Sequence, residues 1–546
     1  MLKILKETIL MINNFIINVK NFLKRDYFLC KILYCFFISI LNFYLAEHSA
    51  THHQIRSSLE IFVLPFFFFS LGAIPSAILN SILISLILFD IVVTYKCGFV
   101  TNQTIQAIIG TNKHEIISML QTNNVAVILL SISLIILSVI FSYKIGKFNF
   151  KTIVVTGIVL LIPVADIYYM VIMGKGNFKV KMALVKDVSS FVRKKIPGVI
   201  GDTEYAFVQF IYPHKDPLFL SPPLFHQKRD VSVIGQHKGN THNIVFIMGE
   251  SSLASRYGVY GYKTQDTTPY LNRMVVDNKL CVIPHSHSAA PMTTFSVPMT
   301  FSFFSPGKPD LLLAEKNLIE LARDNNYKTF WIASQDGSSF YARTYGYISE
   351  FSNYVTRQDF NNQQNGVNWR DESLLPVIKE KFLDKNPDKF YVIHIMGSHE
   401  NYADKRTEED ILALPNADEY DQSIHRTDRI LHQIIDMADR ELGNYVLVYT
   451  SDHGEVVGKG HGLQYGGYDQ YNIPMIIGDP TDKYCHYAEK IRNVDGYYSS
   501  LMNKYLLLDM LGYDIDPKVI EADRHTDPVL HSDDKVYQYR DIPTSK

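Results

Sequence analysis

Acidic and histidine side chains follow several short apolar runs in the second half of this 546-residue chain. Three runs end this way: 243–249 before Glu250, 390–396 (which contains His394) before His399, and 445–450 before Asp452 and His453. A lone Asp or His at the end of a strand is more often a helix cap or a satisfied core residue. Three such endings in one domain instead favour a divalent cation bound by carboxylates and imidazole.

A cation held by Glu250, Asp452 and His453 keeps an open coordination position, and a hydroxyl bound there loses its proton easily. Residues 288–298 form a hydroxyl-rich stretch of small residues that can supply this nucleophile. Thr293 is our choice, although Thr294 and Ser296 are nearly equal candidates on spacing alone. The alternative interpretation of this stretch is an ordinary N-terminal helix cap.

Several other enzyme classes lose support from the motifs. The chain has no Gly-rich phosphate loop of the Walker kind, no GxSxG elbow and no HExxH helix, which disfavours a nucleotide kinase or an esterase. Residues 281–285 read Cys-Val-Ile-Pro-His and lack the Ser-Arg continuation found where such a cysteine matures to formylglycine. Sulfate-ester cleavage by that route is excluded.

The elements that must position these residues alternate along the chain. Apolar runs typical of strands occur at 243–249, 327–333, 390–396 and 445–450, and helical segments at 313–325, 372–383 and 421–440 separate several of them. This alternation predicts an α/β sheet, in which ligands gather at the carboxyl ends of the strands.

The apolar residues before position 175 predict a membrane domain. Five windows meet or approach the roughly twenty residues of a transmembrane helix: about 27–46, 60–75, 76–95, 124–143 and 152–172. We interpret the first window as a retained anchor and not as a removed signal peptide. Basic residues precede it and recur at Lys144, Lys147 and Lys151, as cytosolic segments should. Five crossings then place the C-terminal part outside the cytosol.

We therefore expect a transmembrane domain at 1–172, a linker with interfacial helices at 173–240, and a catalytic domain at 241–546. Lys plus Arg number 53 against 55 for Asp plus Glu, so no overall positive charge favours nucleic acid as a partner. The five cysteines show no CxxC pair and no regular framework, so we expect disulfides to contribute little.

A longer set of motifs carries a family resemblance. In order, it comprises Gly249-Glu250-Ser251, Tyr260-Gly261-Tyr262 with Thr267-Thr268-Pro269, Thr293 with Ser296-Val297-Pro298, His394 with Gly397-Ser398-His399, Tyr420-Asp421, Thr427-Asp428, residues 451–455 and His461-Gly462. Together with the five predicted helices, this set resembles the phosphoethanolamine transferases of Gram-negative inner membranes, in the alkaline phosphatase and sulfatase superfamily.

The resemblance implies a fold, a cofactor and site roles. The fold would be a five-helix transmembrane bundle followed by an alkaline phosphatase/sulfatase-like α/β domain in the periplasm of a multi-pass inner-membrane protein. Zinc, or manganese with the same donor types, would be bound by Glu250, Thr293, Asp452 and His453, with Thr293 the nucleophile. The other implied roles are substrate phosphate or a second metal for His394, His399 and His461, and the donor's amine for Thr111 and Glu115.

The implied reaction is a ping-pong transfer. Phosphatidylethanolamine would donate its head group to Thr293, and an acceptor hydroxyl of lipopolysaccharide or another envelope glycan would then take it. The chain departs from relatives at Ala107, where they place Asn. It also departs at Ala289 and Met299, where members that modify lipid A carry cysteines. These departures favour the disulfide-poor branch, in which the acceptor is often a core sugar of lipopolysaccharide and less often lipid A.

Two alternatives remain at this point. A phosphoglycerol transferase of the same superfamily shares the membrane plan and the metal site but takes its head group from phosphatidylglycerol, and Glu115 argues mildly against it. A catalytically silent membrane sensor or scaffold would usually have lost at least one of Glu250, Thr293, Asp452 and His453, and all four are present.

Overall fold

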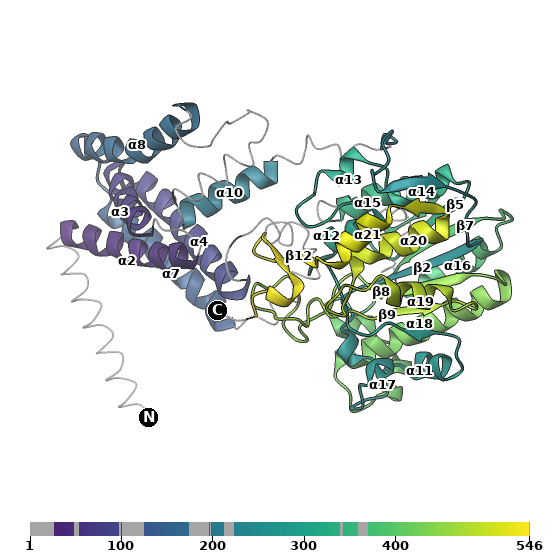
Figure 1. The fold of residues 1–546 in the computed structure, drawn as a ribbon. Helices are drawn as coiled ribbons and strands as arrows, with labels where there is room; N and C mark the ends of the chain where they lie inside the picture. The colour runs from purple at the N-terminus through teal and green to yellow at the C-terminus, as the bar shows by residue number, and fades with distance from the viewer. Residues whose placement is uncertain are drawn as a thin grey trace, which may run out of the picture. The chain divides into compact units, whose positions relative to one another are not determined.

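The computed structural model describes residues 27–48, 54–97, 100, 125–173, 196, 198–211, 223–338, 342–358 and 370–544. These residues divide into two compact units, a helical one up to Ile211 and an α/β one from Pro223 (Figure 1).

The helical unit contains α2 (Tyr27–His48), α3 (Gln54–Ser70), α4 (Ala73–Cys97), α7 (Val125–Ile145), α8 (Phe150–Met173) and α10 (Val199–Ile211). Among the described residues, three stretches are long and apolar enough to cross a membrane: Tyr27–Ala46, Ala73–Tyr95 and Val127–Ile145. Shorter apolar stretches lie at Ser57–Ser70 in α3 and Phe150–Ile162 in α8. Five helices thus occur near the five predicted windows. That all five cross the membrane remains a prediction.

The boundary between α3 and α4 lies earlier than the pattern of apolar residues suggests. The windows 60–75 and 76–95 divide a continuous apolar run, whereas the chain turns at Leu71 and Gly72. Gly72 takes a φ of +109°, a conformation that favours glycine and ends the helix. In the predicted linker, α10 begins where the Val199 amide donates to Asn42 Oδ1 of α2 at 3.0 Å.

The α/β unit is built on a seven-stranded sheet with the order β3-β9-β8-β2-β7-β5-β6. Its strands are β3 (Cys281–Val282), β9 (Met475–Gly478), β8 (Val446–Ser451), β2 (Asn243–Gly249), β7 (Lys389–His394), β5 (Lys328–Ala333) and β6 (Tyr354–Thr356). The strands from β8 to β6 are parallel, and β9 runs antiparallel to both of its neighbours. The four predicted strands are the central four, which confirms the α/β prediction.

Helices cover both faces of this sheet because its strands are apolar on both sides. One layer contains α12 (Thr293–Phe301), α14 (Leu318–Asp324), α15 (Arg343–Ser349), α19 (Lys483–Lys490) and α20 (Asn503–Leu511), and the other α11 (Pro269–Val276), α16 (Leu375–Phe382) and α18 (Glu419–Glu441).

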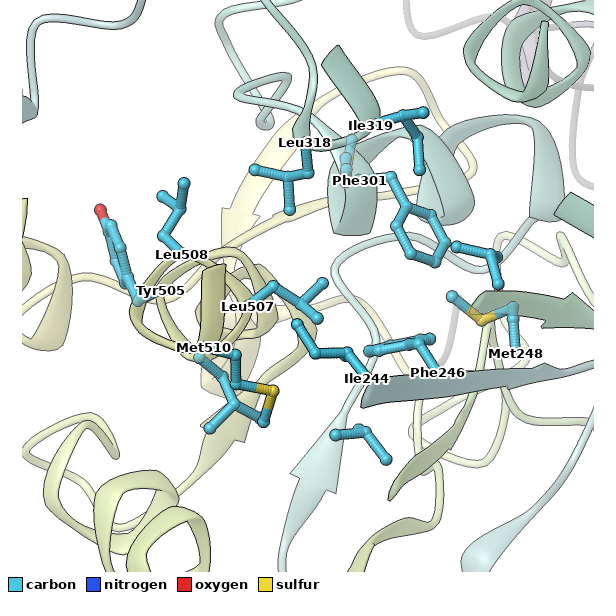
Figure 2. Packing of buried hydrophobic residues seen from close by; sticks show 14 of the residues in the cluster. Ile244, Phe246, Met248, Phe301, Leu318, Ile319, Tyr505, Leu507, Leu508 and Met510 are labelled. Carbon is cyan, nitrogen blue, oxygen red and sulfur yellow. The ribbon is translucent and has the colours of Figure 1, made fainter. Parts of the chain in front are cut away.

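The alternating side chains of β2 supply both cores. Ile244, Phe246 and Met248 pack toward α12, α14 and α20 (Figure 2), while Val245 and Ile247 face the α16 and α18 side. Each of these side chains is fully buried, which contributes roughly 2 kcal/mol apiece. The strand that precedes Glu250 is therefore held from both sides.

Small sheets and short helices complete the unit. The pairs are β1 (Val233–Gln236) with β11 (Tyr513–Ile515), β4 (Ser286–His287) with β10 (Tyr498–Ser499), and β12 (Pro528–Leu530) with β13 (Val536–Gln538); the helices are α13 (Leu311–Ala314), α17 (Glu408–Ala413) and α21 (Pro517–Arg524). The helical segment expected at 313–325 is split, because Asn317 and Glu320 form a capping box that starts α14 afresh.

A disulfide joins Cys281 on β3 to Cys485 on α19, with a Cα–Cα distance of 6.3 Å. The expectation that disulfides contribute little is therefore wrong. The two cysteines are 204 residues apart in sequence, and they meet only because the antiparallel edge of the sheet lies beside α19. Because Cys281 is bonded in this way, the formylglycine route is doubly excluded.

Candidate active site

The candidate site lies at the carboxyl edge of the central strands. Glu250 follows β2, and Asp452 and His453 follow β8, which pairs with β2 in parallel register so that Gly249 lies opposite Ser451. Parallel neighbours end at the same edge of a sheet, so their following residues are brought together although about 200 positions separate them in sequence.

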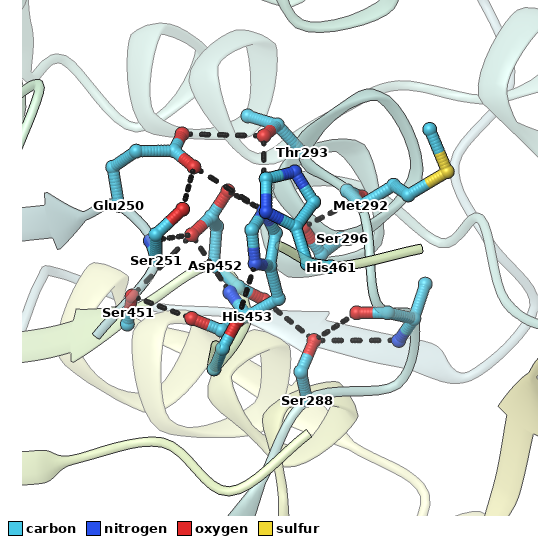
Figure 3. A network of polar contacts seen from close by, with 12 residues as sticks. Glu250, Ser251, Ser288, Met292, Thr293, Ser296, Ser451, Asp452, His453 and His461 are labelled. Atoms are coloured by element: carbon cyan, nitrogen blue, oxygen red, sulfur yellow. Dashed lines mark hydrogen bonds and ion pairs between the residues drawn. The ribbon is translucent and has the colours of Figure 1, made fainter. Parts of the chain in front are cut away.

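The three predicted metal ligands converge on one small volume (Figure 3). One ligand atom from each of Glu250, Asp452 and His453 lies within 4.8 Å of the others, and all three residues are buried. His453 Nε2 is 3.2 Å from Glu250 Oε1 and 3.3 Å from Asp452 Oδ2. The other ring nitrogen, Nδ1, lies 2.8 Å from the Gly454 carbonyl oxygen and donates to it when protonated, which leaves Nε2 facing the two carboxylates.

The backbone holds one oxygen of Asp452 and leaves the other open. Oδ1 accepts hydrogen bonds from the amides of Ser251 and His453, at 3.1 and 2.7 Å. Oδ2 is buried and accepts no hydrogen bond from any described residue. A buried carboxylate oxygen without a donor is costly, and a metal ion is the kind of partner that removes this cost.

The pKa values of Glu250 and Asp452 also favour a bound cation. Burial raises the pKa of Asp452 well above its ordinary value, and the neighbouring charge of Glu250 adds to this. Burial also raises the pKa of Glu250, but the hydrogen bond and charge of His453 outweigh it and hold that pKa well below its usual range. Two adjacent buried carboxylates resist carrying two charges, and a divalent cation would let both ionise. The donor set therefore fits such an ion.

Thr293 is the first residue of α12 and reaches the same cluster. Its Oγ1 donates to Glu250 Oε2 at 3.2 Å and lies 3.3 Å from His453 Nε2. The positive end of the helix dipole favours negative charge on an oxygen at this position. Ser288 supports the loop before the helix, because its hydroxyl accepts from the Ala290 amide at 3.3 Å and donates to backbone carbonyls that include the one of Asp452.

The other two candidate hydroxyls are engaged elsewhere. Pro298 inside α12 has no amide proton for the Thr294 carbonyl, and the Thr344 hydroxyl of α15 donates to that oxygen instead, at 2.6 Å. Thr294 Oγ1 lies 3.2 Å from the same Thr344 hydroxyl, and Ser296 Oγ donates to the Met292 carbonyl. Of the three, only Thr293 has its hydroxyl directed at the ligand cluster.

Three further histidines surround the cluster. The rings of His453 and His461 are 4.0 Å apart, and those of His461 and His399 are 6.0 Å apart. His461 Nδ1 is 2.9 Å from Glu455 Oε2, and His453, Glu455 and His461 form a second group with metal-ligand spacing. A second cation site is therefore compatible with these side chains.

His394 lies within β7, between Met248 of β2 and Ala333 of β5. Both ring nitrogens are buried without a hydrogen-bond partner among the described residues. Burial lowers the pKa of His394 to about 4, although the charge of Glu250 opposes this shift. A neutral imidazole with two unused nitrogens suits a ligand such as a phosphate oxygen or a metal.

Residues 242–511 match the sulfatase family. This span includes the four central strands, the clustered Glu250, Asp452 and His453, and Thr293. The match covers 270 of the 546 residues, which is just under half of the chain.

Named relatives of this chain are transferases. The chain is 26% identical to phosphoethanolamine transferase EptC of Escherichia coli over 343 residues, which cover 57% of this chain and 59% of that one. It is 26% identical to phosphoethanolamine transferase EptA of Helicobacter pylori over 446 residues, or 75% and 78% of the two chains. The chain thus spans less than two thirds of the E. coli relative and more of the H. pylori one.

An integral membrane protein shares the fold. The integral membrane lipooligosaccharide phosphoethanolamine transferase A (EptA) from Neisseria meningitidis aligns over 87% of this chain and 95% of its own, with 17% identity and a TM-score of 0.57. At this identity the likeness shows the fold alone, which includes apolar helices before a sulfatase-family domain.

Two predicted donor-binding residues, Thr111 and Glu115, lie outside the described residues. One residue of the site escaped the sequence analysis: Gln335 donates from Nε2 to Glu250 Oε2 at 2.8 Å. Its position in the sequence indicated a site residue, because Gln335 comes shortly after the predicted strand 327–333, as Glu250 and Asp452 come after their strands. Glutamine at a strand end does not stand out as a carboxylate or a histidine does.

Proposed function

We propose that this protein transfers phosphoethanolamine from phosphatidylethanolamine to an envelope acceptor, through a phosphothreonine intermediate on Thr293. The observation that carries the proposal is the position of Thr293 Oγ1 at the start of α12, within 3.3 Å of both Glu250 and His453. The names of the E. coli and H. pylori relatives support phosphoethanolamine as the transferred group.

Glu250, Thr293, Asp452 and His453 would hold the metal ion, which we propose to be zinc. An imidazole, two carboxylates and a hydroxyl oxygen make a four-coordinate set that suits zinc, and manganese accepts the same donor types. When bound, zinc would lower the pKa of the threonine hydroxyl and polarise a phosphate oxygen.

In the first half-reaction, Thr293 Oγ1 attacks the phosphorus of the donor lipid. The new bond joins Oγ1 to phosphorus, and the bond from phosphorus to the diacylglycerol oxygen breaks. One proton balances this step, because the threonine hydroxyl loses it and the departing diacylglycerol oxygen takes it up, so that diacylglycerol leaves as a neutral alcohol.

In the second half-reaction, an acceptor hydroxyl attacks the same phosphorus and the bond from phosphorus to Thr293 Oγ1 breaks. Oγ1 takes up the proton that the acceptor hydroxyl loses. His394, His399 and His461 would bind the phosphate oxygens in both steps, since they surround the cluster and each carries an imidazole that can donate a hydrogen bond. Thr111 and Glu115 would contact the donor's amine.

We propose the bacterial inner membrane as the location, with the catalytic domain in the periplasm. Apolar helices before the domain support an embedded anchor, which a lipid donor requires. The disulfide between Cys281 and Cys485 supports an oxidising compartment for the α/β unit. Lipopolysaccharide core sugar, lipid A or another envelope glycan would then be within reach as acceptor.

The test is intact-mass analysis of the full chain in detergent after incubation with phosphatidylethanolamine. We expect a phosphoethanolamine adduct that is absent from Thr293→Ala. Thr294→Ala and Ser296→Ala are matched controls, because their hydroxyls bond within α12 or to α15, and both should still form the adduct. An adduct from phosphatidylglycerol only would favour a phosphoglycerol transferase, and no adduct with either lipid would contradict the proposed chemistry.

The acceptor is identified by a separate measurement. Mass spectrometry of lipopolysaccharide and other envelope glycans, from cells that contain the wild-type chain or Thr293→Ala, should show one glycan that carries phosphoethanolamine only with the wild type. If no glycan differs between the two strains, the proposed class of acceptor is wrong.

A further inference from the structure

Gln335 contacts the metal-ligand cluster from the strand beyond β7, through its hydrogen bond to Glu250. It follows β5, is buried, and directs its amide toward Glu250, with Nε2 2.8 Å from Oε2. The same amide nitrogen donates to the Ile395 carbonyl oxygen at 3.3 Å. Gln335 thus links the ends of three neighbouring strands, β5, β7 and β2.

The hydrogen bonds to Glu250 show what this amide does. Oε1 accepts from the Ser251 hydroxyl at 2.8 Å and faces His453, while Oε2 accepts from Thr293 and Gln335. Thr293 loses its proton in the proposed reaction, so the bond it donates disappears. Gln335 is then the only described side chain that still donates a hydrogen bond to Oε2.

A buried carboxylate fixes the backbone around this amide. Asp371 is buried, and its Oδ1 accepts from the Ser334 hydroxyl at 2.6 Å and from the Met396 amide at 2.7 Å. Its Oδ2 accepts from the Gly397 amide at 3.1 Å. Asp371 therefore ties the residue before Gln335 to the turn after β7, and the position of the Gln335 backbone does not depend on Glu250.

We propose that Gln335 is a positioning residue that orients the Glu250 carboxylate for metal binding and holds it there when Thr293 is deprotonated or phosphorylated. The inference rests on the proposed metal site. Hydrogen bonds to metal-ligating carboxylates fix their orientation, and losing such a bond typically lowers metal affinity 10- to 100-fold. Zinc affinity is thus the property that Gln335 should control.

A purely structural role predicts a different pattern. Removing a buried amide that bonds a backbone carbonyl lowers stability wherever it lies in the molecule, without any effect on a distant metal site. Gln422 of α18 offers this comparison, because it is buried and its Nε2 donates to the Leu414 carbonyl oxygen at 2.9 Å. Its other partner is Arg406, and neither contact involves the ligand cluster.

The experiment measures zinc affinity of the full chain in detergent, by competition with a chromophoric chelator after removal of bound metal. Gln335→Met keeps the side-chain length and removes the donor, and Gln422→Met is the matched control. We expect Gln335→Met to bind zinc about 10- to 100-fold more weakly and Gln422→Met to bind like the wild type. Excess zinc should restore lipid-dependent adduct formation in Gln335→Met.

Glu250→Gln separates this proposal from the proposed function. If Glu250→Gln weakens zinc binding and Gln335→Met does not, the role of Gln335 is refuted while the metal site stands. If Glu250→Gln leaves zinc affinity unchanged, the proposed metal site is wrong and the inference about Gln335 fails with it. An equal loss of affinity in Gln335→Met and Gln422→Met would also overturn the proposal, because it indicates general destabilisation.

Discussion

Gly397 packs against the backbone of Glu250. Gly397 has a φ of +48°, and a Cβ built on it would lie 2.8 Å from the Glu250 carbonyl oxygen and 3.0 Å from its amide nitrogen. The Ser398 amide donates to that same carbonyl at 3.1 Å. The turn that presents His399 therefore touches the backbone of Glu250, a proposed metal ligand, with no room for a side chain between them.

Gly397→Ala should disturb both stability and the site. A left-handed φ and an overpacked contact together should cost about 3 kcal/mol of unfolding free energy, and the displaced Glu250 should weaken zinc binding. Gly443→Ala is the matched control, since Gly443 has a φ of +68° but no heavy atom within 4 Å of its Cβ position. Denaturant unfolding and zinc titration of both variants provide the measurement. Equal effects in the two would show that contact with Glu250 is unimportant.

At the scale of elements, α17 is tied to α18 by one buried carboxylate. Asp410 forms the capping box with Thr407. Its two carboxylate oxygens also accept hydrogen bonds from the Arg429 guanidinium, at 2.9 and 3.0 Å. His425 Nδ1 lies 2.8 Å from the same carboxylate. Burial raises the pKa of Asp410, but the bonds from His425 and Arg429 outweigh this and hold it below its ordinary value.

This pairing predicts a pH dependence of stability. A carboxylate with a depressed pKa stabilises the fold above its unfolded pKa of about 4, and the contribution is lost as pH falls toward the folded value. Asp410→Asn should lower the unfolding free energy by about 3 kcal/mol at pH 7. The difference from the wild type should narrow below about pH 4, as measured by denaturant unfolding.

Asp436→Asn serves as the control for Asp410→Asn. Asp436 is half exposed and lies 3.7 Å from His432, so its loss should change stability by less than about 1 kcal/mol. If Asp410→Asn lowered the unfolding free energy at pH 7 no more than this control does, the bonds of Asp410 to α18 would contribute little to stability.

At the scale of the whole molecule, the disulfide closes a long loop of the α/β unit. It joins the edge strand β3 to α19, and the two cysteines are 204 residues apart in sequence. A cross-link of this kind stabilises a domain chiefly by restricting its unfolded chain. It also requires an oxidising environment during folding.

Replacing both Cys281 and Cys485 by Ala should lower the unfolding free energy of the α/β unit by about 2–4 kcal/mol. The wild-type chain isolated from the membrane without reductant should resist alkylation at these two positions, as peptide mass mapping would reveal. Because neither cysteine contacts the ligand cluster, zinc affinity of the folded double variant should match the wild type. Full alkylation of Cys281 in the isolated wild type would refute an oxidised bond.

Much of the site was visible from the sequence because strand ends are local signals. Apolar runs followed by Glu250 and by Asp452-His453 identified three residues that the structure brings within 4.8 Å of one another. Parallel pairing of buried strands makes this inference possible, since such strands must end at one edge of the sheet. The same rule applied to the strand at 327–333 would have included Gln335.

The sequence by itself determined the α/β fold, the central strands and the acidic and histidine residues at their ends, because hydrophobic period and residue type are local properties. Only the tertiary structure shows which of Thr293, Thr294 and Ser296, equivalent in spacing, directs its hydroxyl at Glu250 and His453. The choice depends on α15, whose Thr344 engages Thr294, and on the first turn of α12, which engages Ser296 and directs Thr293 at Glu250. The tertiary structure also revealed the disulfide and the hydrogen bond from Gln335 to Glu250. Each depends on a contact between segments that are far apart in the chain.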